Sequence, residues 1–133
     1  MKFNTQICTT REQSERLLAL GLKKETADCF IWHCDNKDYT ALNSPDSLVE
    51  ERKGDIYVWS LHRLMELCPK SIHLDDYADT HYYLRTTPGE VLYQRYDKTW
   101  LRIFDTGNVF DRMVDMIEWL IKNNYFNKEY LEE

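Results

Sequence analysis

The segment from Asn108 to Asn124 has a hydrophobic pattern that limits the possible folds more than any other part of the chain. Apolar residues recur there at the i, i+3, i+4, i+7 spacing that places side chains on one face of an α-helix. The stripe consists of Phe110, Met113, Val114, Ile117, Leu120 and Ile121. We therefore predict an amphipathic helix that buries one side in the domain, with Asn108 as its N-cap.

Trp119 falls outside this stripe. At about 100° per residue it is expected among Arg112, Asp115 and Lys122, on the side that faces water. Tryptophan and tyrosine are enriched at protein interfaces, because a large ring fills a pocket while its polar tip keeps a hydrogen bond. Two interpretations stay open: contact with a partner or a second copy, and burial under residues 35–55 or the aromatic tail.

The ends of two further helices can be recognised. Residues 9–13, Thr-Thr-Arg-Glu-Gln, offer a capping box in either of two registers. Ser60 is the expected N-cap of the second helix, where Trp59 can pack on Leu64 as a hydrophobic staple. Pro69 should end this helix, because proline cannot continue its hydrogen-bond ladder.

Several segments are rich in β-branched and aromatic residues and predict strands. Cys29–Cys34 suits a mostly buried strand, and Trp100–Phe104 suits a strand before the last helix. His81–Thr86 and Val91–Tyr96 flank a proline-glycine turn and predict a hairpin. Residues 35–55 lack periodicity and are expected to form a long loop.

The two faces of this hairpin differ if it closes symmetrically about Pro88 and Gly89. One face, the more apolar, should pack on helices; it contains Tyr82, Leu84, Val91, Tyr93 and Arg95. The other contains His81, Tyr83, Arg85, Leu92, Gln94 and Tyr96. Together the elements predict a single domain over residues 1–133. Its fold class should be α+β, with a small, mainly antiparallel sheet of two to four strands and two or three helices packed on one face.

The sequence contains no recognisable catalytic residues, metal site or cofactor motif. Cys29, His33 and Cys34 are close together, but they lack the spacing of a zinc site, and on a strand Cys34 would point away from the other two. No nucleophile elbow is present, and the four glycines form no phosphate-binding pattern. The four cysteines are expected to be reduced thiols.

The segment from His73 to His81 is the one place where an enzyme of unfamiliar type is conceivable. Asp75, Asp76 and Asp79 lie between the two histidines and could serve acid/base or divalent-metal chemistry. A solvated acidic loop accounts for the same residues, because no calcium-loop spacing or glycine is present.

Charge argues against nucleic acid and membrane partners. Asp and Glu outnumber Lys and Arg by 23 to 17, which gives a net charge of −6. Binding to nucleic acid or to an anionic membrane draws most of its strength from clustered Lys and Arg. A single-stranded nucleic-acid binder, with bases stacked on Tyr83 and Tyr96, is therefore the less favoured alternative. With no signal peptide or transmembrane run, we expect a cytoplasmic protein.

Three strings carry a resemblance that spans most of the chain. They are the Thr-Arg-Glu-Gln start, residues 58–70 (Val-Trp-Ser-Leu-His-Arg-Leu-Met-Glu-Leu-Cys-Pro-Lys) and residues 113–121 (Met-Val-Asp-Met-Ile-Glu-Trp-Leu-Ile). The chain resembles uncharacterised small proteins carried by prophages and mobile elements of gut bacteria. The resemblance implies a cytoplasmic accessory role and assigns no site.

The sequence thus favours a non-enzymatic accessory or interaction protein that binds a protein partner or forms a homo-oligomer. The candidate partner-contact residues are Trp119, Arg112, Tyr125, Tyr83, Arg85 and Tyr96.

Overall fold

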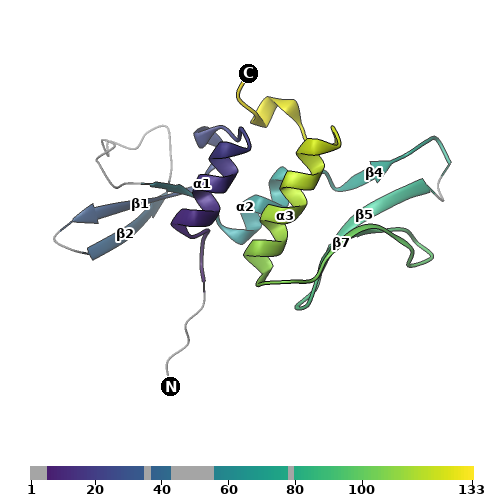
Figure 1. The fold of residues 1–133 in the computed structure, drawn as a ribbon, viewed down its shortest axis with the longest axis horizontal. Helices are drawn as coiled ribbons and strands as arrows, with labels where there is room; N and C mark the ends of the chain where they lie inside the picture. Colours follow the sequence, from purple (N-terminus) through teal and green to yellow (C-terminus); the bar gives the residue numbers. More distant parts are fainter. Residues whose placement is uncertain (1–5, 35–36, 43–55, 78–79) are drawn as a thin grey trace.

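The computed structural model describes residues 6–34, 37–42, 56–77 and 80–133 (Figure 1). Over these residues the chain forms three α-helices and two antiparallel sheets, so the predicted α+β class is confirmed. The helices occupy the middle of the molecule, and one small sheet extends on either side of them (Figure 1). The β-strands are thus divided between two sheets, where the sequence predicted one.

The helices begin where capping side chains are available. Thr10 caps α1 in a capping box with Gln13, which selects the second of the two predicted registers. Asn108 caps α3 as predicted, in a capping box with Asp111. Ser60 caps α2, also as predicted. The bounds are α1 Arg11–Ala19, α2 Leu61–Leu67 and α3 Val109–Lys122, with short 3₁₀ turns η1 Lys24–Thr26 and η3 Lys128–Tyr130.

The first sheet has the strand order β2-β1-β3. Its strands are β1 Cys29–Cys34, β2 Lys37–Leu42 and β3 Ile56–Val58. The prediction of a loop over 35–55 is wrong for β2, which pairs with β1 along its whole length from Cys34↔Lys37 to Cys29↔Leu42. β2 is a strand because its backbone pairs with β1. The hydrophobic pattern of the sequence does not show that pairing. Residues 35–36 and 43–55 of the predicted loop lie outside the described residues.

The second sheet has the strand order β4-β5-β6-β7. Its strands are β4 Ser71–His73, β5 His81–Thr86, β6 Val91–Gln94 and β7 Trp100–Phe104. The pairs Thr86↔Val91 and Leu84↔Tyr93 confirm the predicted symmetric hairpin. β6 ends two residues earlier than predicted, where a bulge interrupts its pairing with β7 and a tight turn follows.

The hydrophobic core surrounds α3, which contacts α1, α2, β6 and β7. The predicted apolar stripe is confirmed: Phe110, Met113 and Ile117 are among its buried members. Val91 and Tyr93 of β6 are fully buried on the inner face of the second sheet, where α3 covers them. Among the described residues, no helix has the length and apolar content needed to cross a bilayer.

Candidate protein-contact surface

The outer face of the second sheet, on the side away from α3, carries exposed aromatic side chains. Tyr83 pairs with Gln94, and Gln94 pairs with Trp100, so these three residues form one row across β5, β6 and β7. Half of the Tyr83 side chain (50%) and half of Trp100 (52%) are exposed to solvent. Because side chains alternate along a strand, this row points away from the buried Val91 and Tyr93.

Arg85 extends this row by two residues along β5. Its Nη1 atom donates a 2.6 Å hydrogen bond to Oε1 of Gln94, so the guanidinium lies beside the aromatic row. The amide of Gln94 in turn donates to the carbonyl of Lys98 at 3.0 Å. Both the oxygen and the nitrogen of the Gln94 side-chain amide are therefore hydrogen-bonded, and the held oxygen orients Arg85. We call Tyr83, Arg85, Gln94 and Trp100 the outer face.

The structure brings two of the predicted contact residues, Tyr83 and Arg85, together on the outer face. Tyr96 is 98% exposed and lies in the turn between β6 and β7. Trp100 was not predicted as a contact residue. Its position depends on the bulge between Tyr93 and Gln94, and no sequence signal places such a bulge.

The expected position of Arg112 on a water-facing side is wrong. Only 6% of Arg112 is exposed, and its guanidinium donates to the carbonyls of Pro88 (3.2 Å), Asn108 (3.2 Å) and Gly107 (3.3 Å). The turn between β5 and β6 lies against this part of α3 and covers it. Arg112 therefore connects the turn to the helix and is not available to a partner.

Trp119 and Tyr125 are both half-buried within their own chain. The Trp119 ring lies 5.5 Å from the ring of Tyr125 and 6.5 Å from that of Tyr93, measured between centroids. Both residues pack against the main core. The structure therefore favours the intramolecular interpretation of Trp119, in which the tail after α3 folds back over the indole.

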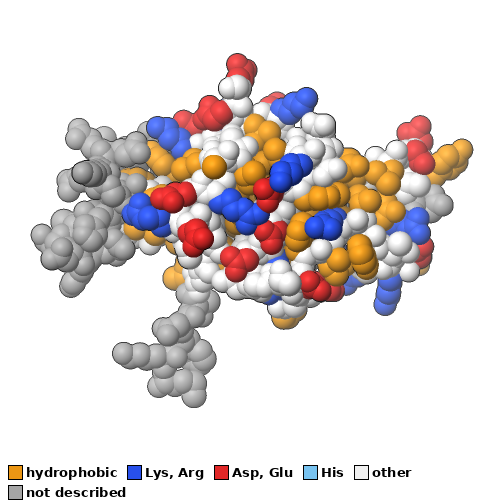
Figure 2. Space-filling view, in the orientation of Figure 1, with side chains coloured by type: hydrophobic (Ala, Val, Ile, Leu, Met, Phe, Trp, Pro, Cys, Tyr) orange, Lys and Arg blue, Asp and Glu red, His pale blue; other side chains and the backbone are white. Residues whose placement is uncertain are grey.

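Charged side chains of both signs alternate across the central helices (Figure 2). Arg16 of α1 forms ion pairs with Asp115, at 2.8 Å, and with Glu118 of α3. Lys122 lies 3.1 Å from Glu118 on the same helix. These pairs neutralise Arg16 and Lys122. Figure 2 also shows hydrophobic side chains at the end of the molecule that carries the second sheet.

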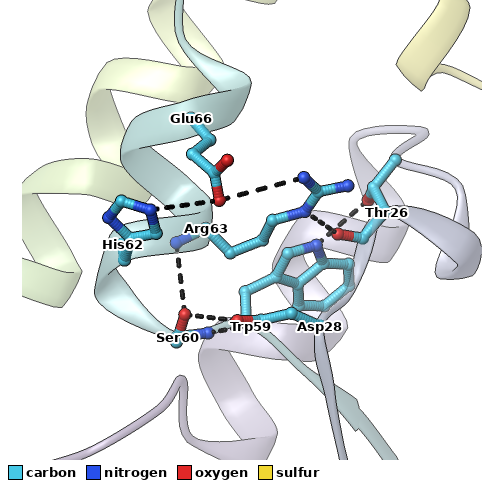
Figure 3. A network of polar contacts seen from close by, with 7 residues as sticks. All are labelled: Thr26, Asp28, Trp59, Ser60, His62, Arg63 and Glu66. Atoms are coloured by element: carbon cyan, nitrogen blue, oxygen red, sulfur yellow. Dashed lines mark hydrogen bonds and ion pairs between the residues drawn. The ribbon is translucent and has the colours of Figure 1, made fainter. Parts of the chain in front are cut away.

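A polar network connects the start of α2 to η1 and to Asp28, the residue before β1 (Figure 3). The backbone N–H of Ser60 donates to Asp28 at 2.9 Å, and the Ser60 hydroxyl also donates to this carboxylate. Arg63 donates through Nε to the carbonyl of Thr26 at 2.7 Å, and the buried indole of Trp59 donates to the Thr26 hydroxyl at 3.0 Å.

Serine, histidine and aspartate all occur in this network, but they do not form a catalytic triad. His62 points toward Glu66, 3.4 Å away, and away from Ser60 (Figure 3). The Ser60 hydroxyl caps α2 by accepting from the N–H of Arg63. Nucleophilic catalysis requires the base to reach the nucleophile. The network therefore has a structural role.

Of the remaining candidate residues, His73 and His81 come together, with their rings stacked at 3.7 Å between centroids. Burial raises the pKa of the Cys29 thiol to about 11, and the carboxylate of Asp28 adds to the effect. The side chains of His33 and Cys34, and residue Asp79, lie outside the described residues. Among the side chains that the structure does describe, no three His, Cys, Asp or Glu residues converge to hold a metal ion.

Two cavities can be described. The larger, of about 490 Å³, lies between the N-termini of α1 and α3 and is lined by polar residues that include Gln13 and Asp111. The smaller, of about 310 Å³, lies between the end of α2 and the tail and is lined in part by Cys68 and Tyr125. His73 and His81 line neither cavity.

Comparison with protein-family models, with curated proteins and with solved structures finds no match for this chain.

Proposed function

We propose that this chain is a non-enzymatic accessory protein of a phage or mobile element that acts in the cytoplasm by binding a protein partner through the outer face. The observation that carries the proposal is the row of half-exposed Tyr83 and Trp100 with Arg85 fixed beside it. Tyrosine, tryptophan and arginine are the residue types that contribute most to binding energy at protein interfaces.

The chemistry of the outer face indicates what the partner offers. Arg85 presents a guanidinium, which forms its strongest hydrogen bonds with carboxylates. Tyr83 and Trp100 present rings that are already partly ordered by the sheet, so little side-chain entropy is lost when they are covered. The partner is therefore a protein surface with pockets for two rings and an acidic side chain beside them.

Charge favours a protein over a nucleic acid at this surface. The chain has a net charge of −6, and Arg85 is the one Lys or Arg among the four residues of the outer face. A backbone of phosphates would need several cations along its path. A carboxylate on a folded partner needs only one.

Site-specific cross-linking in the organism that encodes the chain tests the proposal. A photoreactive amino acid replaces Tyr83 in one strain and exposed Glu15 of α1 in a control strain. We expect one discrete cross-linked protein with the Tyr83 probe and none of it with the Glu15 probe. Equal cross-linking at both positions, or none at Tyr83, would refute the proposal.

The cross-linked protein is then purified and titrated with single variants of the outer face. Tyr83→Ala, Arg85→Ala and Trp100→Ala should each weaken binding, and the strongest by about 30-fold, as for an interface hot spot of about 2 kcal/mol. Tyr77→Ala is the control, because Tyr77 is 73% exposed but lies outside the outer face. Unchanged affinity in all three variants would assign the contact to another surface.

A further inference from the structure

β7 lies at the edge of the second sheet. It pairs with β6 on one side, and in the described part of the chain nothing beyond β6 forms a backbone hydrogen bond with it. In an antiparallel sheet, every second residue of an edge strand directs its backbone N–H and C=O groups away from its neighbour. β7 therefore offers backbone donors and acceptors to a further strand.

Most of β7 is regular enough to accept such a strand. The bulge affects only its first residues, and residues 102–104 pair in unbroken register with residues 91–93 of β6. Ladders of this length occur elsewhere in the molecule, because β3 pairs with β1, and β4 with β5, over three residues each. The regular part of β7 is therefore as long as strand pairs that this fold already contains.

The side chains of β7 differ on the two sides of the sheet. Ile103 pairs with Leu92, which in turn pairs with Arg85, so Ile103 lies on the same side as the outer face. Arg102 pairs with buried Tyr93 and lies on the opposite side. A strand added to β7 would continue the outer face on one side and meet a guanidinium on the other.

Arg102 lacks a carboxylate partner. Its side chain is exposed and lies over the ring of Phe104, 4.4 Å from the centroid, and it forms no ion pair with any acidic residue that the structure describes. Guanidinium groups form their strongest hydrogen bonds with carboxylates. An acidic side chain opposite Arg102 is therefore the chemistry that this edge favours.

A second copy of the chain does not supply that carboxylate from the same strand. The sequence of β7, Trp-Leu-Arg-Ile-Phe, contains no acidic residue. Pairing of β7 with β7 of a second copy would leave both Arg102 side chains without a carboxylate. The edge thus favours a different chain with an acidic extended segment.

We propose that the protein partner adds an extended segment to β7, antiparallel to it and with an acidic residue opposite Arg102. This inference rests on the proposed function, because it describes how the partner of the outer face is held. Backbone hydrogen bonds along the edge provide affinity, and alternate side chains provide selectivity. On the other side of the added strand, apolar side chains cover Ile103 and lie beside Trp100 of the outer face.

A short capped peptide of alternating valine and glutamate is the probe. In this peptide all carboxylates lie on one side of the strand, as the contact with Arg102 requires. Titration of the ¹⁵N-labelled chain, followed by NMR, should shift the backbone amide resonances of residues 101–104 in a saturable manner. The same peptide methylated at every backbone nitrogen keeps its charge but cannot donate, so it should not bind. A valine–lysine peptide should bind at least about tenfold more weakly.

Variants of the chain test the role of the guanidinium. Arg102→Gln should weaken binding of the glutamate peptide by about tenfold. Lys70→Gln is the matched control, because Lys70 is also exposed but precedes β4 at the opposite edge, and it should bind the peptide as the unaltered chain does. The amide spectrum of each variant shows whether it is folded. Binding of the methylated peptide, full binding by Arg102→Gln, shifts centred on β4, or no saturable shift would each overturn the inference.

Cross-linking at Tyr83 decides the proposed function separately. A partner cross-linked at Tyr83, with no peptide bound at β7, would refute the edge inference alone. Peptide bound at β7, with no partner cross-linked at Tyr83, would refute the outer face as a contact surface and leave the edge as a site for acidic extended segments.

Discussion

The side-chain amide of Gln13 donates a 2.7 Å hydrogen bond to Oδ1 of Asp111, 98 positions further along the chain. Each of these residues is the third residue of its helix and belongs to its capping box. The N-termini of α1 and α3 are therefore joined by the same side chains that cap them. Local helix stability and the packing of the two helices depend on one another at this point.

This relationship predicts that Asp111→Ala destabilises the domain by about 1 to 2 kcal/mol, because a cap bond and the bond from Gln13 are lost together. Urea denaturation of Asp111→Ala, Gln13→Ala and the double variant measures the coupling. We expect a coupling free energy of at least about 0.5 kcal/mol. Exposed Glu12 of the same turn serves as control in the variant Glu12→Ala. Strictly additive effects would show that the two caps act separately.

Trp119→Ala should lower the free energy of unfolding by about 2 to 4 kcal/mol without changing the molecular mass in solution. The indole packs against Tyr93, Tyr125 and the main core, so its removal leaves a cavity within the chain. Thermal denaturation and light scattering give the two readouts. Tyr96→Ala, at a position that is 98% exposed, should change stability by less than about 0.5 kcal/mol. A stable Trp119→Ala variant whose mass has fallen would restore the interpretation of Trp119 as an association contact.

Arg112→Met should destabilise the domain by about 2 kcal/mol, although methionine fills much of the same space. The substitution removes the hydrogen bonds that the guanidinium donates to the carbonyls of Gly107, Asn108 and Pro88, and hydrogen bonds from a charged donor contribute about 1.5 to 3 kcal/mol. Chemical denaturation measures the loss, with Lys70→Met as a control at an exposed position. Equal stability of Arg112→Met and the unaltered chain would mean that packing alone connects the turn to α3.

The ion pairs of Glu118 predict a contribution to stability that depends on pH. Hydrogen bonds from Arg16, and then from Lys122, lower the pKa of the Glu118 carboxyl below its ordinary value of 4.5. A lowered pKa in the folded state means that the contribution is present above the unfolded value and is lost as the pH falls through the folded value. The pair is partly exposed, so the contribution is small.

Urea midpoints of Glu118→Gln and the unaltered chain should therefore differ at neutral pH and converge in acid. Glu129→Gln, at an exposed position of η3, is the control and should follow the unaltered chain throughout. A difference that stays constant down to the acid limit would contradict an electrostatic origin.

Local patterns predicted the helices and the central hairpin well. The cap of α3 at Asn108 and its buried stripe depend on residues within four positions of each other, so they are visible in the chain itself. The register of β5 and β6 follows from the two-residue turn between Thr87 and Glu90, because a short turn fixes the pairing. The α+β class follows from these elements together.

Contacts between distant segments settled the rest. β2 exists through its pairing with β1, Arg112 is buried because the turn at Pro88 covers it, and Trp119 is shielded by Tyr93 and Tyr125. The outer face joins Tyr83 to Trp100 through a bulge, and the pairing of β4 with β5 brings His73 against His81. Side-chain periodicity reports only which residues share a side of one element. Which neighbour covers that side depends on packing between elements, and this alone separates the buried residues from those that can meet a partner.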